Sequence, residues 1–148
     1  MATASYLTNR GLYLLMSTDF DAIDFRAMLI KNEVAAATGR DHNTLNEAIT
    51  AGTEADCTGY SRKTLAGVTT TESDASDNVT VAFSSVSWGA LGGASNCAIA
   101  QMVIYKYNAS DSSAEVIAYV GGSSLSFTTN GSTVTSTTPT FTATSTAT

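Results

Sequence analysis

Few residues of this chain have the types and spacing that catalysis requires. His42 is the only histidine, so a Ser-His or Cys-His mechanism would depend on it, and no G-x-S-x-G motif accompanies it. Glu47 and Glu54 could form the carboxylate pair of a glycosidase, which flanks a sugar at a separation of about 5 to 10 Å. No other feature supports hydrolysis. We therefore expect a protein without enzyme activity and place His42 in a solvated loop.

Metal and cofactor sites are also not indicated by the sequence. Cys57 and Cys97 lack a C-x-x-C motif and a neighbouring histidine, which argues against a zinc site supplied by this chain. Asp19, Asp21 and Asp24 could bind a hard cation, but the glycine and distal glutamate of a calcium loop are missing. We expect no cofactor, no metal and two reduced thiols.

Arg62 and Glu54 are the residues for which we predict a specific polar contact. Arg62 follows the turn-forming Gly59, and a single arginine beside a tight turn can bind a nearby carboxylate through two hydrogen bonds. Glu54 lies just upstream and is the natural partner. The predicted role of this pair is to fix a loop.

Trp88, Tyr105, Tyr107 and Tyr119 form a second set of candidate residues. Aromatic faces pack in cores and interfaces, and they also stack on sugar rings. The alternating spacing of these residues is typical of strands and favours core or interface packing. A sugar-binding platform stays open as the alternative.

Composition and charge narrow the class of protein. The chain has 148 residues, 43% hydrophobic content and a net charge of -6, enough apolar content for one domain with its own core. Its seven Lys and Arg residues are not clustered, so we expect no nucleic-acid partner. No apolar run reaches the roughly 18 residues of a membrane helix, and a secretory signal pattern is missing. We expect synthesis in the cytoplasm and no membrane partner.

The pattern of apolar residues predicts a mainly β protein, an antiparallel β-sandwich or jelly-roll-like single domain with a short N-terminal helix. Helical spacing covers residues 3–16. Residues 98–107 are apolar on both faces and predict a central strand, with 116–120 as its hairpin partner. Further strands are expected at residues 25–30, 65–71, 79–84, around Trp88, and from Leu125 to Phe127.

The C-terminal segment differs in composition from the rest of the chain. Residues 133–148 are almost entirely Thr, Ser and Ala, with Val134, Pro139 and Phe141 as the larger apolar groups. We expect a domain at residues 1–132 and a Thr/Ser-rich assembly arm at 133–148, ordered only by contact with another subunit. Val134, Pro139 and Phe141 are its candidate interface residues.

Several short blocks give the chain a family likeness that spans about residues 1–129. Together they resemble a widespread group of small structural proteins in tailed-phage virions. The blocks that carry the resemblance are Arg26 to Ile30, Asp41 to Leu45, Glu54 with Thr58 to Arg62, Leu65 to Gly67, Val86 to Trp88, Ile104 to Lys106 and Ile117 to Tyr119.

The resemblance implies a function as well as a β-rich fold. It implies a capsid cement or decoration protein on the virion surface, made in the cytoplasm of a bacterial host. The implied partners are the major capsid protein and copies of the chain itself, as a trimer or dimer. The alternative is a tail or fibre module that binds host glycans through Trp88, Tyr105 or Tyr107.

Overall fold

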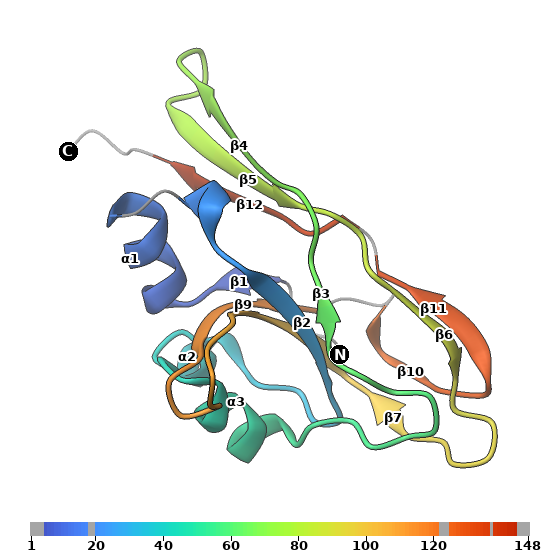
Figure 1. Ribbon diagram of the computed structural model, residues 1–148. Coiled ribbons are helices and arrows are strands. Elements are labelled where there is room, and N and C mark those ends of the chain that lie inside the picture. Colours follow the sequence, from blue (N-terminus) through green and yellow to red (C-terminus); the bar gives the residue numbers. More distant parts are fainter. Residues whose placement is uncertain (1–4, 18–19, 122–124, 137, 145–148) are drawn as a thin grey trace.

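The computed structural model describes residues 5–17, 20–121, 125–136 and 138–144 (Figure 1). The helices are α1 (Asn9–Ser17), the short 3-10 helix η1 (Phe20–Ala22), α2 (Ala36–Gly39) and α3 (Leu45–Gly52). The strands are β1 (Tyr6–Leu7), β2 (Phe25–Ile30), β3 (Lys63–Thr64), β4 (Val68–Ser73), β5 (Asn78–Phe83), β6 (Ser87–Leu91), β7 (Ala98–Ile99), β8 (Gln101–Lys106), β9 (Glu115–Val120), β10 (Phe127–Thr128), β11 (Ser132–Thr135) and β12 (Thr140–Thr144).

The strands form antiparallel sheets in one small domain, which confirms the predicted mainly β, sandwich-like class. A five-stranded sheet in the order β1-β9-β8-β2-β3 lies at the centre. A three-stranded sheet, β12-β5-β4, and two strand pairs, β11-β6 and β10-β7, complete the structure. None of the helices in the described part of the chain is long and apolar enough to cross a membrane.

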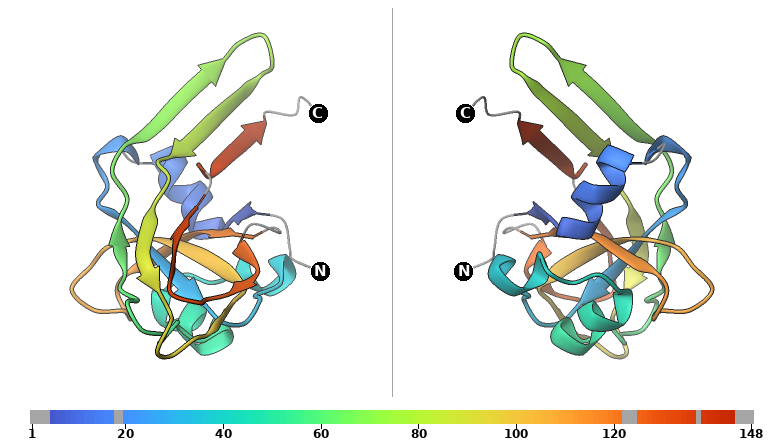
Figure 2. Two further views of the ribbon diagram at one scale, coloured as in Figure 1. Left: turned by 90° about the vertical axis from the view of Figure 1, so that its right-hand side faces the viewer. Right: turned by 90° about the vertical axis from the view of Figure 1, so that its left-hand side faces the viewer.

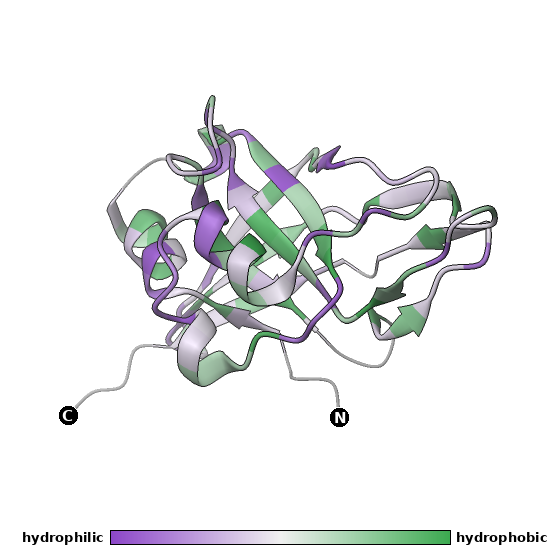
Figure 3. Ribbon diagram, turned by 90° about the horizontal axis from the view of Figure 1, so that it is seen from below, coloured by the Kyte–Doolittle hydropathy of each residue, from purple (hydrophilic) through white to green (hydrophobic). Residues whose placement is uncertain are grey.

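Strand β8 is central in its sheet, as its apolar pattern predicts. It pairs with β2 on one side and β9 on the other. One face of the sheet packs on α2 and α3, and the other contacts α1 and the smaller sheets, so the core has two apolar clusters. Gln101 is fully buried, and its side-chain amide is satisfied by the backbone of Val34 through bonds of 2.7 and 3.3 Å. Figure 3 shows hydrophobic segments on the central strands as well as on the helices and strands around them.

The N-terminal helix begins later than the predicted residues 3–16. Tyr6 and Leu7 instead form β1, which pairs with β9, and α1 starts at Asn9. Gly11 explains how α1 lies so close to the sheet. A Cβ atom added at Gly11 would lie 2.2 Å from the backbone oxygen of Ile117, so only glycine fits at this crossing.

Strands β4 and β5 form the predicted hairpin, which extends away from the main body (Figure 2). Strand β12 runs along the other side of β5, with Phe141 opposite Val81. The hairpin is therefore the outer part of a three-stranded sheet, of which β4 and β12 are the two edges.

The described C-terminal residues fold onto their own domain, so the prediction of an arm ordered only by a neighbouring subunit is wrong. Strand β11 pairs with β6, and β12 pairs with β5. Phe141 and Pro139 are buried, and Val134 is half-buried against the core. These side chains fill a hydrophobic space that the rest of the domain leaves open. Their apolar area, together with the strand hydrogen bonds, offsets the entropy cost of ordering the segment.

Candidate functional site: the Arg62 cluster and the exposed groove

The loop after α3 carries the polar residues that the sequence singles out. A capping box at Thr44 and Glu47 starts α3, because the Glu47 carboxylate accepts the backbone N–H of Thr44 at 2.7 Å. Glu54 follows the helix and bridges to Ile30 at the end of β2. Gly59, with φ of 76°, then turns the chain toward Arg62. Helix, bridge and turn together bring Glu54 and Arg62 to the same place.

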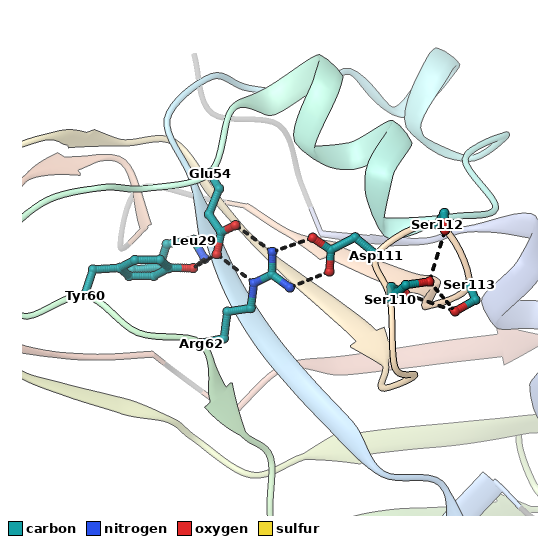
Figure 4. Close-up of polar contacts among 8 residues, drawn as sticks. All are labelled: Leu29, Glu54, Tyr60, Arg62, Ser110, Asp111, Ser112 and Ser113. Carbon is teal, nitrogen blue, oxygen red and sulfur yellow. Dashed lines mark hydrogen bonds and ion pairs between the residues drawn. The ribbon is translucent and has the colours of Figure 1, made fainter.

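Arg62 binds two carboxylates at once (Figure 4). Its Nε and Nη2 atoms donate to the two oxygens of Glu54, both at 2.7 Å. Nη1 and Nη2 donate to Asp111, in the turn between β8 and β9, at 2.6 and 3.0 Å. The guanidinium therefore makes bidentate contact with both partners, a geometry that arginine supports and lysine does not.

Tyr60 extends this cluster to the central sheet. Its hydroxyl donates to Glu54 at 2.9 Å and accepts the backbone N–H of Leu29, in β2, at 3.3 Å. Burial raises the pKa of Tyr60 far above its ordinary value, and the negative charge of Glu54 adds to the shift. The phenol therefore stays protonated and acts as a fixed hydrogen-bond donor.

The charges of the Arg62 cluster stabilise one another. Hydrogen bonds from Arg62 lower the pKa of Asp111, and the bonds to Glu54 and Asp111 raise the pKa of Arg62. Both residues are thus held in their charged forms near neutral pH. Through these contacts the cluster holds the loop of residues 54–62 against β2 and against the β8-β9 turn. Its role in the structure is to stabilise this loop.

Glu47 and His42 are also engaged in structural contacts. Backbone hydrogen bonds at Thr44 lower the pKa of Glu47, so this carboxylate serves as a helix cap. His42 is half-buried, with Nδ1 lying 2.6 Å from the hydroxyl of Tyr119. His42 lies in a loop, as expected, but it is only partly solvated because the loop packs over β9. Glu54 belongs to the Arg62 cluster and Glu47 to the cap of α3, so each of the two carboxylates is bound to partners of its own.

The four aromatic candidates do not form a platform. Trp88 and Tyr119 are fully buried and Tyr105 nearly so. The indole N–H of Trp88 donates to the backbone oxygen of Ser61 at 2.8 Å, beside the Arg62 cluster. Tyr107 is the partly exposed member, and the Arg26 guanidinium lies 3.4 Å above its ring centre. Burial favours the prediction of core packing.

Cys57 and Cys97 are both free thiols, buried in the same apolar cluster. Burial raises the pKa of Cys57, and a hydrogen bond with Cys97 adds to the effect. Within the described residues no group of three or more potential ligands could hold a metal ion. Asp19 lies outside the described residues, while Asp21 accepts a hydrogen bond from Thr70 and Asp24 contacts Arg26.

A feature that the sequence analysis missed is an exposed apolar surface on α1. Met16 is 80% exposed, Tyr13 57% and Leu12 39%. Leu12 and Met16 border an open groove of about 630 Å³ between the N-terminal elements and β12, with Thr8 and Thr142 among the other lining residues. The helical pattern of residues 3–16 gave no sign of this surface, because the groove depends on where β12 lies.

A scan of protein-family models, a search of curated proteins and a search of solved structures each returned no match for this chain.

Proposed function

We propose that this chain is a structural protein of a tailed-phage virion, and that it acts as a capsid cement protein bridging major capsid proteins. Its partners are then the major capsid protein and copies of itself, and it has no catalytic role. The proposal combines the family resemblance of residues 1–129 with the properties of the molecular surface.

The observation that carries the proposal is the contrast between the polar cluster and the exposed apolar groove. Arg62, Glu54 and Asp111 are bound to one another, so their charges serve the fold. Three of the four exposed large apolar side chains among the described residues, Leu12, Tyr13 and Met16, instead lie on α1, and Leu12 and Met16 border the groove. Exposed apolar residues grouped beside a groove are typical of a protein-binding surface.

The fold has features of a rigid domain, which a capsid cement protein needs. The central sheet is covered on both faces, and the Arg62 cluster links two loops to that sheet. A covered sheet with fixed loops is the kind of rigid domain that bridging two capsid proteins at a set separation requires. The glycan-binding alternative is less favoured, since Trp88 and Tyr105 are buried and the exposed ring of Tyr107 is already in contact with the Arg26 guanidinium.

The experiment that tests the proposal is decoration of capsids in vitro. Capsids assembled without this protein are mixed with the purified chain and separated on a density gradient. We expect saturable co-sedimentation and greater resistance of the particles to heat. Failure to bind capsids under conditions where the protein is folded would contradict the proposal.

A further inference from the structure

Strand β12 has a free backbone edge. The N–H of Phe83 donates to the carbonyl of Pro139 at 2.9 Å, so the backbone groups of residue 139 point toward β5. The backbone N–H and C=O groups of successive residues point to opposite sides of a strand, and the register of β12 with β5 is regular. The backbone groups of Phe141 and Ala143 therefore also point toward β5. The N–H and C=O groups of Thr140, Thr142 and Thr144 therefore point away from the sheet, and no described residue bonds to them.

Among the described residues, the outer edge of β12 has no charge, bulge or covering segment of the kind that usually prevents strands from pairing. Edge strands are commonly protected by charges, prolines, bulges or covering segments. Strand β12 has the sequence Thr-Phe-Thr-Ala-Thr and carries no charge. The opposite edge of the same sheet, β4, contains Glu72, and Thr70 of that strand is hydrogen-bonded to Asp21 in η1. The two edges thus differ in how they are protected.

The groove beside β12 has room for an added strand and offers it an apolar cover. Leu12 and Met16 of α1 line the groove together with β12, and they also line a second cavity with Val79 and Ala143 on the inner face of the sheet. A strand added to β12 would continue this sheet beneath the helix. Its inward side chains would then cover Met16, which is 80% exposed in the single chain.

The charge of the groove lining is compatible with a second copy of the chain as the occupant. The protein has a net charge of -6, so most surfaces of two copies repel each other. The groove lining contains no carboxylate and one cation, Arg40. Two copies can approach at this groove without bringing carboxylates of its lining together. The neighbouring cavity contributes one carboxylate, Asp21, which accepts a hydrogen bond from Thr70.

We propose that β12 pairs antiparallel with β12 of a second copy about a twofold axis at Thr142. In this register Thr142 faces its own counterpart and Thr140 faces Thr144, which pairs all three outward-pointing residues. Phe141 then lies across from Ala143, and both already face the inner side of the sheet. The backbone and the side chains therefore favour the same alignment, and the two three-stranded sheets join into one. This inference deepens the proposed function by specifying the contact between copies.

Sedimentation velocity of the intact chain over a wide concentration range tests this pairing. The wild type is expected to reach twice the 15.3 kDa mass of the chain. Thr142→Pro should stay a monomer, because proline removes an outward N–H and places a ring at the edge without breaking the bonds to β5. Thr142→Val is the matched control and should dimerise like the wild type. Near-UV circular dichroism checks that each variant is folded.

A second pair of variants tests the contact between α1 and the added strand without changing the sequence of β12. Met16→Glu should weaken the dimer about tenfold or more, because it places a charge where the added strand lies. Tyr13→Glu changes an exposed residue of the same helix that lines neither cavity, so its dimer should be unchanged. A wild type that is monomeric at every concentration, a trimer, or a dimer unaffected by both Thr142→Pro and Met16→Glu would overturn the pairing.

Capsid binding by the same variants separates this inference from the proposed function. A folded, monomeric Thr142→Pro protein that still binds capsids supports the β12 pairing and leaves the cement function standing. A wild-type dimer that depends on Thr142 but binds no capsid supports the pairing and contradicts the cement function.

Discussion

Replacing Arg62 with alanine should destabilise the domain by about 2 to 3 kcal/mol. The change removes four hydrogen bonds of 2.6 to 3.0 Å and leaves two carboxylates without their cation. Charged hydrogen bonds contribute roughly 1.5 to 3 kcal/mol each when buried. The side chains of Arg62, Glu54 and Asp111 are 29%, 24% and 41% exposed, so solvent screening reduces that sum considerably.

Urea unfolding followed by fluorescence provides the assay, because Trp88 is the only tryptophan and is fully buried. In a thermal melt followed by the same fluorescence, each kcal/mol should lower the melting temperature of a chain of this size by roughly 2 to 4 °C, so we expect a decrease of about 4 to 12 °C. Lys63→Ala removes a nearby cation that has no ion pair with any described residue, and it should cost less than about 0.5 kcal/mol. Equal stability of the two variants would refute the structural role of Arg62.

The pH dependence of the free energy of unfolding gives an independent check of the ion pair between Arg62 and Asp111. Arg62 lowers the pKa of Asp111 in the folded protein below its ordinary value of 3.8. A group whose pKa is lowered by folding adds stability above its unfolded pKa and loses it as the pH falls through the folded pKa. The stability difference between wild type and Asp111→Asn should therefore be full at pH 7 and shrink below about pH 4. A difference that stays constant with pH would contradict the ion pair.

Three further predictions concern packing and thiol reactivity. Gly11→Ala should destabilise the protein by about 1 to 3 kcal/mol in urea unfolding because its Cβ meets the β9 backbone, whereas Gly89→Ala, which has open space around it, should be nearly neutral. Phe141→Ala should cost about 3 kcal/mol or more while Thr142→Ala costs much less, since only the phenylalanine is buried; equal losses would mean that β12 does not pack on the core. Cys57 is buried and burial raises the pKa of its thiol, so disulfide reagents should label the native protein slowly and at a rate limited by opening of the fold, and rapid labelling would argue against burial.

The elements that the sequence predicts best are those whose signal is local. Strand β8 is apolar on both faces, and such a strand has few stable positions other than the middle of a covered sheet. The β4-β5 hairpin follows from alternation on both sides of a polar turn. The contact of Arg62 with Glu54 could also be anticipated, because the two residues are close in sequence and complementary in charge.

The features that escaped prediction depend on distant parts of the chain. Strand β12 has a Thr-rich composition that resembles a disordered tail, and it is ordered because Phe141 fits beside Phe83 and Val81. Asp111 is 49 residues from Arg62, and a turn rich in serine does not reveal an ionic contact. Tertiary packing decides both cases, so local pattern alone could not settle them.

The copy number of this protein in purified phage particles tests the cement function most directly. Quantitative mass spectrometry with isotope-labelled peptides of this chain and of the major capsid protein measures the ratio of the two. A cement protein is expected in a fixed ratio to the capsid protein, with hundreds of copies in each particle. A particle that lacks the chain, or that holds only the few copies typical of a tail component, would contradict the account.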